Sequence, residues 1–170
     1  MKRIFSYNVN GIRAALKKDF LTWMKQADPD ILCIQETKAQ NGQMSENEFE
    51  ALGYSMYSYS AEKAGYSGVA LLTKEKPIHV EYGMGNSKYD KEGRVIRADF
   101  GSFSVISAYF PSGTTGDARQ AFKMDFLADF HGIVRLYRDL VRLRLNRDGF
   151  TRGLCGQSTQ VYHQIGRAHV

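Results

Sequence analysis

The fold class depends on one stretch, Ile31-Leu32-Cys33-Ile34-Gln35-Glu36-Thr37-Lys38. Its first four residues form a continuous apolar run, which is typical of a short strand covered on both faces of a sheet. The run then passes abruptly into polar side chains that have no role in a core. A strand of this kind indicates an α/β protein, in which ligands collect just beyond the carboxyl ends of the strands.

A preceding strand has the same design. Residues 3–9 are predicted to form it, and it ends in the polar sequence Tyr7-Asn8-Val9-Asn10-Gly11. A helix is predicted over residues 12–26, because its apolar side chains recur at helical spacing. The strand–helix–strand order brings the two strand ends together, so we expect Asn8 and Glu36 to lie at one edge of the sheet.

The following residues predict mainly strands. Ser45 and Glu48 form a capping-box pattern before a short helix. Gly101-Ser102 is a two-residue turn, which predicts a hairpin. Asp117 is expected to begin a helix that continues to about Asn146. The remaining predicted elements are strands at 54–60, 68–72, 78–82, 94–100 and 103–110, and loops at 83–93 and 111–116.

Length and composition indicate a single globular domain. The chain has 170 residues, of which 43% are hydrophobic and 24% charged. It holds no apolar run of membrane-spanning length, and its start passes into a strand without a signal-peptide core. Cys33 and Cys155 do not make a disulfide framework. We therefore expect a cytoplasmic protein without a membrane partner.

The basic charge is confined to one part of the chain. The formal net charge is +5, and residues 131–170 carry all of this excess, whereas residues 1–130 are neutral overall. Lysine disappears and arginine takes over near residue 130. We therefore divide the chain into a domain at 1–130 and an Arg-rich tail at 131–170. Any phosphate partner of the first part must be recognised by placed residues rather than by bulk charge.

Glu36 and Asn8 are the leading candidates for a cation site. A Glu that closes an apolar strand is costly unless it is paired or bound to a metal, and Asn is depleted in strands. Carboxylate and amide oxygens suit a hard cation. For Glu36 the alternatives are a salt bridge to Lys38 or a helix-cap role, and for Asn10 the alternative is a helix-cap role.

Four further residues could contact a phosphate. Tyr109 lies at the end of a predicted strand, although an aromatic residue is ordinary there. Lys38, Arg94 and Arg119 carry the positive charge that a phosphate requires. Solvated surface positions are the ordinary alternative for these three residues.

Five stretches resemble, in the same order, the exonuclease III family of apurinic/apyrimidinic endonucleases, part of the endonuclease/exonuclease/phosphatase superfamily. The resemblance covers residues 1 to about 130. The stretches are Ser6-Tyr7-Asn8-Val9-Asn10-Gly11-Ile12-Arg13-Ala14, Gln35-Glu36-Thr37-Lys38, Gly65-Tyr66-Ser67-Gly68-Val69-Ala70-Leu71-Leu72, Gly93-Arg94-Val95-Ile96-Arg97 and Ala108-Tyr109-Phe110-Pro111.

The resemblance implies a fold and a reaction. The family fold is a four-layered α/β sandwich, and this chain would form its amino-terminal half: one mixed sheet with flanking helices, followed by a long helix and an irregular tail. The family reaction is metal-dependent hydrolysis of DNA phosphodiesters, 5′ of an abasic site or from a 3′ end, by monomeric enzymes that use Mg²⁺ or Mn²⁺.

The resemblance also assigns roles to the candidate residues. Glu36 would ligate the metal with support from Asn8, and Tyr109 would hold the scissile phosphate. Substrate contacts would come from Asn10, Lys38, Arg94 and Arg119.

The chain departs from the family after residue 130. The family's second half supplies a Gly-Asp-x-Asn segment and an Asp-His pair, and neither occurs here. Water activation and leaving-group protonation each contribute factors of about 10²–10⁴, so the chain alone is expected to be inactive. Residues 164–170 match a translated sequencing-adapter read, which predicts that residues 131–170 are foreign or artefactual.

Two other functional interpretations stay open. In one, the chain is a non-catalytic DNA-binding module whose Arg-rich helix, with Arg135, Arg138 and Arg142, follows phosphates. In the other, it is an unfolded or aggregating fragment, because a single sheet taken from a two-sheet sandwich leaves an apolar face bare.

Overall fold

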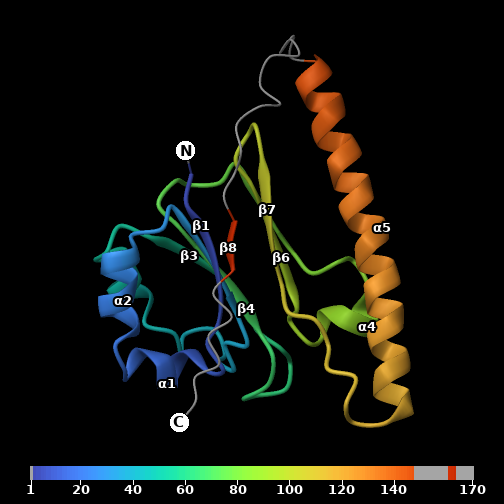
Figure 1. Ribbon diagram of the computed structural model, residues 1–170, viewed down its shortest axis with the longest axis horizontal. Coiled ribbons are helices and arrows are strands. Elements are labelled where there is room, and N and C mark those ends of the chain that lie inside the picture. Colours follow the sequence, from blue (N-terminus) through green and yellow to red (C-terminus); the bar gives the residue numbers. More distant parts are fainter. Residues whose placement is uncertain (1, 148–160, 164–170) are drawn as a thin grey trace. The chain divides into compact units, whose positions relative to one another are not determined.

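The structure, a computed structural model, describes residues 2–147 and 161–163. The chain forms two compact units, which are treated separately below. The first comprises Met1–Tyr109 and Thr159–Val170, and the second comprises Phe110–Ser158. Figure 1 gives the element labels used from here on.

The larger sheet of the first unit has five strands in the order β3-β4-β2-β1-β8. β1 and β2 are parallel, with Asn8 opposite Gln35, whereas β4 is antiparallel to both β2 and β3. Ile31, Leu32, Cys33 and Ile34 are all buried, which confirms the prediction of a strand covered on both faces. The strands are β1 (Ile4–Asn8), β2 (Ile31–Gln35), β3 (Ser55–Tyr59), β4 (Val69–Thr73) and β8 (Val161–His163).

Three helices cover one face of this sheet: α1 (Ile12–Leu16), α2 (Phe20–Ala27) and α3 (Glu46–Glu50). The prediction of one continuous helix over residues 12–26 is wrong, because the chain breaks between α1 and α2. A continuous helix would place Ile12 and Phe20 about 80° apart around its axis. The break lets both side chains reach the same core cluster. Ser45 precedes α3, but its side chain makes no capping hydrogen bond.

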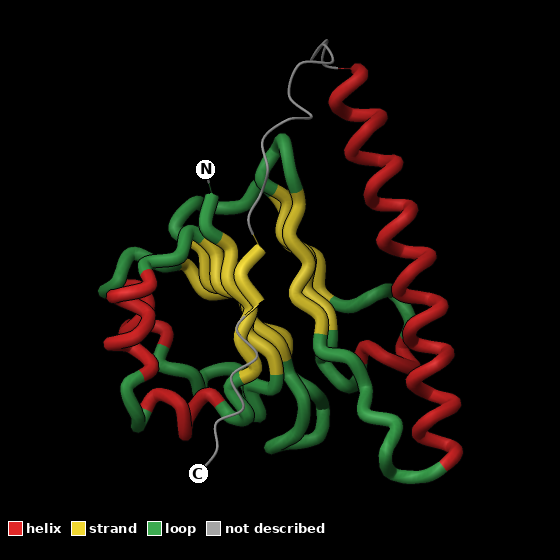
Figure 2. Tube along the Cα trace, in the orientation of Figure 1, coloured by secondary structure: helices red, strands yellow, loops and turns green. Residues whose placement is uncertain are grey.

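A second sheet of the first unit has three antiparallel strands in the order β5-β6-β7. Figure 2 shows the strands in two separate groups. The α/β class is confirmed, but the prediction of one mixed sheet is corrected, since these strands pair only with one another. Strand propensity is local, whereas the choice of partner depends on the rest of the fold. The strands are β5 (His79–Tyr82), β6 (Val95–Asp99) and β7 (Ser104–Ala108).

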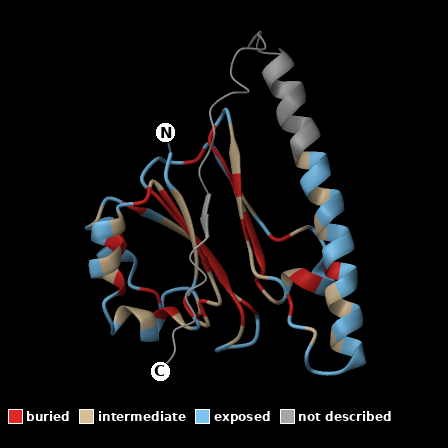
Figure 3. Cartoon of the chain, in the orientation of Figure 1, coloured by how far each residue is buried: buried red, intermediate tan, exposed pale blue. Residues whose placement is uncertain are grey.

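The two sheets share a core. Cys33, Val69 and Leu71 of the larger sheet join Ile96 and Ala98 of the smaller sheet in one buried cluster. Figure 3 shows the central strands of the larger sheet as buried. The expectation of a bare apolar face is therefore wrong for β2 and β4, because helices cover one face and the second sheet covers the other.

A short helix, α4 (Ser87–Asp90), lies in the segment predicted to be a loop. The Asn86 side chain caps it by accepting a hydrogen bond from the Lys88 backbone N–H at 3.0 Å. The Asp90 carboxylate accepts from the backbone N–H groups of Met84 and Asn86. Four residues are too few for a helical period, so a pattern search could not find this element.

The second unit contains the predicted long helix, α5, which is one continuous element of 31 residues from Asp117 to Arg147. Phe126 and Phe130, in the first half of this helix, form an aromatic cluster with Phe110, with ring centroids 5.3–6.0 Å apart. Among the described residues, none of the helices has the length and hydropathy of a membrane span.

The tail predicted to be irregular contains one strand. β8 pairs with β1 in parallel register, with Ile4 opposite Val161 and Ser6 opposite His163. Cys155 and residues 164–170, on which part of the tail prediction depends, lie outside the described residues.

Candidate active site

The sheet brings the two predicted strand ends together. Because Asn8 pairs with Gln35, Glu36 lies one residue beyond the paired ends of β1 and β2. Asn8 is exposed, and its side-chain oxygen accepts a hydrogen bond from the Asn10 backbone N–H at 3.0 Å. An amide oxygen has a second lone pair, so Asn8 can still face a cation.

Backbone hydrogen bonds join three loops at this edge. The Gly11 N–H donates to the Glu36 carbonyl at 2.8 Å, and the Ile12 N–H donates to the Thr37 carbonyl at 2.9 Å. The Lys38 N–H donates to the Ser67 carbonyl at 2.8 Å. The loops after β1 and β2 and the loop before β4 therefore form one connected platform, which holds the backbone of Glu36 on both sides.

The backbone of this platform is strained. Asn10, Glu36, Lys38 and Ser67 have φ angles of 48°, 60°, 50° and 48°, in the left-handed region. Such a conformation costs a residue other than glycine about 1 kcal/mol or more, although Asn tolerates it better. Strain of this kind clusters at functional sites, where the surrounding structure maintains it. Apart from the Asn10-Gly11 turn pattern, no sequence signal predicted it.

Gly68 lies directly against Thr37. A Cβ at Gly68, whose φ is +89°, would overlap the Thr37 hydroxyl oxygen. The Thr37 and Ser67 side chains are 1% and 2% exposed, and their hydroxyls have no hydrogen-bond partner among the described residues. The backbone beneath Glu36 is thus packed so closely that only glycine fits at position 68.

Lys38 bridges two of the candidate ligands. Its ammonium lies 3.0 Å from the Glu36 carboxylate and donates a hydrogen bond to the Asn10 side-chain oxygen at 2.5 Å. The salt bridge that the sequence left as an alternative for Glu36 is therefore present. The capping alternative for Asn10 is not seen, since Gly11 occupies the N-cap position of α1.

Tyr109 reaches the same carboxylate from the second sheet. It follows β7 directly, and its hydroxyl lies within the electrostatic influence of the Glu36 carboxylate. Burial raises the pKa of Tyr109 to about 12, with a further contribution from the Glu36 charge, while Arg94 acts in the opposite direction. Tyr109 is therefore neutral at pH 7 and keeps its proton.

Arg94 lies behind Tyr109 rather than on the surface. Its guanidinium, 2% exposed, pairs with Glu92 at 2.5 Å and donates to the Tyr109 carbonyl at 2.9 Å and the Tyr66 hydroxyl at 3.1 Å. It also lies 4.9 Å from the centre of the Tyr109 ring. Each guanidinium nitrogen thus has a protein partner, so a direct phosphate contact would require these bonds to break. Sequence reasoning missed Tyr66, whose contact with Arg94 depends on tertiary structure.

A depression of about 720 Å³ adjoins the site. Arg13, Lys17 and Lys38 give it positive charge, and Glu48 is the acidic residue of its lining. Arg119 belongs to the second unit, where its guanidinium lies 4.3 Å from the centre of the Phe122 ring. Its predicted phosphate contact stays a prediction.

The donor set suits a hydrated divalent cation. It comprises one carboxylate, Glu36, and the amide oxygens of Asn8 and Asn10. Residues 2–147 and 161–163 contain no cluster of three His, Cys, Asp or Glu side chains that could enclose a metal. Mg²⁺ keeps several waters and is often held by one or two carboxylates together with substrate phosphates. The residues therefore fit Mg²⁺ or Mn²⁺ bound from one side, with the outer face left for water and a phosphate.

Two sheets that share a core, helices on one face of the larger sheet and a polar site at the strand ends define a layered α/β protein. Residues 5–154 match the Endonuclease/Exonuclease/phosphatase family, and the chain belongs to that family. This match extends past residue 130, so the predicted boundary there stays a prediction.

Similar proteins come from several organisms. The chain is 41% identical over 137 residues to the DNA repair nuclease APEX1 of Danio rerio, covering 77% of this chain and 44% of the relative. It is 41% identical over 125 residues to an exodeoxyribonuclease of Bacillus subtilis, covering 73% and 48%. An AP endonuclease structure from Archaeoglobus fulgidus superposes with a TM-score of 0.72 at 32% identity, covering 79% and 51%.

The same fold occurs in a 3′-5′ exonuclease from Neisseria meningitidis, with a TM-score of 0.73 at 24% identity, covering 81% of this chain and 53% of that one. The chain spans about half the length of each of these relatives.

Proposed function

We propose that the chain supplies the amino-terminal half of a metal-dependent DNA-repair nuclease of the exonuclease III type. The observation that carries this proposal is the convergence of Glu36, Asn10 and Lys38 on a strained, polar edge of the sheet, with Tyr109 nearby. A neutral hydrogen-bond donor beside a metal-binding carboxylate is the arrangement that stabilises charge developing on a phosphate.

Glu36, with Asn8, would hold Mg²⁺ or Mn²⁺. When bound, the metal would act as a Lewis acid on a phosphate oxygen. Tyr109 would donate its hydroxyl proton in a hydrogen bond to the same phosphate. Its raised pKa keeps that donor protonated throughout the physiological pH range. Arg94 contributes through Tyr109, whose ring and backbone it holds in place.

Substrate recognition would involve Asn10, Lys38 and Arg119, with DNA containing abasic sites or 3′ ends as the substrate. The relatives described above are named as a DNA repair nuclease, an exodeoxyribonuclease and an AP endonuclease, which supports this substrate class. The sequence-based expectations of a monomer in the cytoplasm, without a membrane partner, complete the proposal.

This half of the site handles the metal and the phosphate, but not the proton transfers. The groups that the family resemblance leads us to expect for water activation and leaving-group protonation do not occur in this sequence. Each such group contributes a factor of about 10²–10⁴ to the rate. The chain by itself is therefore expected to bind the metal and DNA but to hydrolyse little.

The test is to incubate the full chain with an abasic-site duplex in Mg²⁺ or in chelator, and to measure both nicking and binding. We expect metal-dependent binding that Glu36→Gln weakens, with nicking below about one-thousandth of that of a full-length relative. Glu48→Gln removes a nearby carboxylate from the depression and serves as the matched control. Binding that is indifferent to metal and to Glu36→Gln would overturn the assignment of this site.

A second candidate is a DNA-binding module based on α5. Arg135, Arg138 and Arg142 are spaced by three and four residues, which places them along one side of the helix. Arg135 is exposed, and the side chains of the other two lie outside the described residues. This interpretation predicts metal-independent DNA binding with a steep salt dependence that Arg135→Ala reduces.

A further inference from the structure

The Lys38 ammonium lies beside two of the side chains that the proposed cation would use. It lies 3.0 Å from the Glu36 carboxylate oxygen and 2.5 Å from the Asn10 amide oxygen. These groups are two of the three side chains that offer oxygens to a divalent cation at this edge. The positive charge on Lys38 therefore satisfies, within the protein, the oxygens that a metal would need.

The backbone fixes the positions from which the Glu36 and Lys38 side chains extend. Glu36 and Lys38 are two residues apart, both have left-handed φ angles, and backbone hydrogen bonds hold each of them to a different loop. Their side chains consequently start from fixed positions on the same platform. The Glu36 side chain is 20% exposed and the Lys38 side chain 36% exposed, so water screens this pair less than an ordinary surface ion pair.

We propose that Lys38 is the resident counter-ion of Glu36 in the metal-free protein, and that a divalent cation must displace its ammonium to bind. The inference rests on the proposed metal role of Glu36. Because two like charges repel each other at close range, the metal and the ammonium compete for Glu36. Lys38 thereby lowers the affinity of the site for metal and keeps Glu36 satisfied when no metal is present.

The displaced ammonium can move into the basic depression beside the site. Lys38 also lines the basic depression, together with Arg13 and Lys17. A lysine side chain is a flexible four-carbon stem, so its ammonium can turn from Glu36 towards the depression while its backbone stays fixed. There it would face a phosphate of a DNA strand. Metal binding at Glu36 and phosphate binding by Lys38 would then support each other.

The experiment measures Mn²⁺ binding to the full chain without DNA, from the loss of the free Mn²⁺ signal in electron paramagnetic resonance. We expect Lys38→Met to tighten Mn²⁺ binding by about tenfold, because it removes a like charge from the site. Lys17→Met removes the same charge elsewhere in the depression, so it should change the affinity less than about twofold. Glu36→Gln should abolish binding, both alone and when combined with Lys38→Met.

The possible outcomes distinguish failure of the Lys38–metal competition from failure of the metal site itself. Equal or weaker Mn²⁺ binding by Lys38→Met, with tight binding by the wild type, would overturn the competition while leaving the metal site intact. No binding by any variant would overturn both the competition and the metal role of Glu36. Circular dichroism of every variant checks folding.

A second measurement observes Lys38 itself and so does not depend on replacing it. In the wild-type chain with ¹⁵N-labelled lysine, added Mg²⁺ should shift the ammonium resonance of Lys38, and Glu36→Gln should remove that shift. An unchanged resonance at saturating Mg²⁺ would contradict displacement.

Discussion

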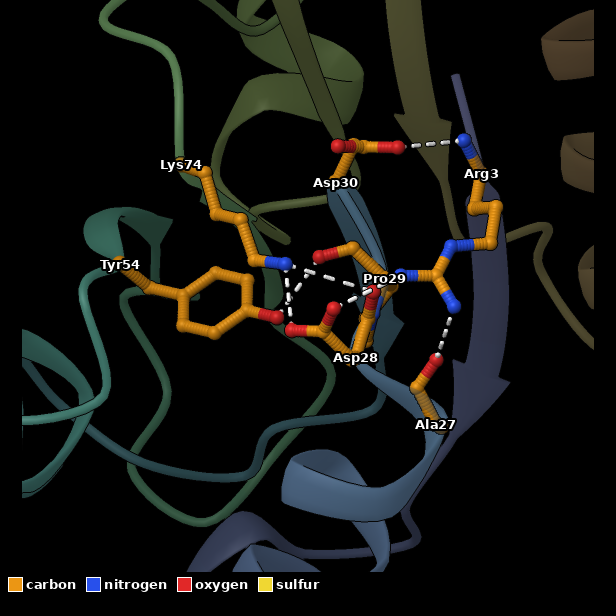
Figure 4. A network of polar contacts seen from close by, with 7 residues as sticks. All are labelled: Arg3, Ala27, Asp28, Pro29, Asp30, Tyr54 and Lys74. Carbon is orange, nitrogen blue, oxygen red and sulfur yellow. Dashed lines mark hydrogen bonds and ion pairs between the residues drawn. The ribbon is translucent and has the colours of Figure 1, made fainter. Parts of the chain in front are cut away.

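The two ends of the larger sheet both carry ion pairs, but they use them differently. At the end where β1 and β2 begin, a network joins Arg3, Asp28 and Lys74 (Figure 4). At the other end, where these strands finish, Glu36, Lys38 and Tyr109 converge. Charge alone therefore does not distinguish a functional site from a structural contact.

The network at the beginning of the strands is closed. The Asp28 carboxylate accepts from Lys74 at 2.5 Å and Arg3 at 2.7 Å, and Asp30 accepts from the Arg3 backbone N–H at 2.7 Å. The Tyr54 hydroxyl donates to the Pro29 carbonyl at 2.6 Å (Figure 4). Every member thus bonds another member of the network, which ties the start of β1 to the turn between α2 and β2.

Backbone conformation separates the two ends. Asp28 also has a positive φ, of 43°, but it is the C-cap of α2, where a left-handed residue ends the helix in the ordinary way. Glu36 and Lys38 end no helix. Their strain is maintained by contacts between loops, and it places a carboxylate and an ammonium beside an open depression. A left-handed backbone that ends no helix, together with converging polar groups, therefore indicates a functional site better than charge does.

The largest effect is expected at the platform. Gly68→Ala should lower the free energy of unfolding by about 3 kcal/mol, because its Cβ would overlap Thr37 at a left-handed φ. Gly65→Ala is the control: its φ is also positive, at +70°, but no atom lies within 4 Å of the new Cβ, so about 1 kcal/mol is expected. Urea denaturation measures both. Equal losses would show that the close contact with Thr37 adds nothing.

A smaller effect is expected in the closed network. Tyr54→Phe leaves the Pro29 carbonyl without its buried donor and should cost about 1 kcal/mol. Tyr57→Phe, on the neighbouring strand β3 and outside this network, is the comparison. If thermal unfolding shows the same small change for both, the Tyr54 hydrogen bond does not stabilise the fold.

Acid should weaken the closed network. Hydrogen bonding to Lys74, supported by Arg3, lowers the pKa of Asp28, with burial opposing the shift. The stabilisation from Asp28 is therefore present above its unfolded pKa, which is near 3.8, and is lost as the pH falls through the lower folded value. Asp28→Asn should be less stable at pH 7 and should lose less stability than wild type between about pH 5 and 2. Parallel pH profiles of the two proteins would contradict this linkage.

At the site, the electrostatic prediction concerns Tyr109. Since Glu36 contributes to its raised pKa of about 12, Glu36→Gln should lower that pKa. Arg94 opposes the shift, so Arg94→Met should not lower it through charge. Nuclear magnetic resonance of ¹³C-labelled tyrosine, with Tyr109→Phe to assign the signal, measures the titration. A pKa of Tyr109 that is insensitive to Glu36→Gln would contradict the electrostatic influence of Glu36 on Tyr109, and with it the proposed role of Tyr109 beside the metal-binding carboxylate.

The smallest effect is expected from Thr37→Val. The Thr37 hydroxyl is buried without a hydrogen-bond partner among the described residues, so its loss should change the free energy of unfolding by no more than about 0.5 kcal/mol. Ser104→Ala removes a hydroxyl that does bond, to Asp99 at 2.6 Å, and should cost more. A large loss for Thr37→Val alone would indicate that its hydroxyl has a role in the platform.

Local patterns predicted most elements of the fold. The strands up to β7 and the helix α5 follow from periodicity and turn residues, because these signals depend on neighbours in the chain. The break between α1 and α2 and the short helix α4 were missed. The division into two sheets was also missed, since pairing depends on residues far apart in the sequence.

The sequence by itself determined that polar residues follow β1 and β2, and hence that Asn8 and Glu36 share one edge, because strand order and polarity are local properties. Only the tertiary structure decided that Tyr109 lies near Glu36, that Arg94 is buried behind Tyr109, and that Lys38 pairs with Glu36. These contacts require the second sheet to pack on the first and the loops to form hydrogen bonds with one another. Both requirements depend on residues that are far apart in the sequence, so no short stretch of the chain predicts them.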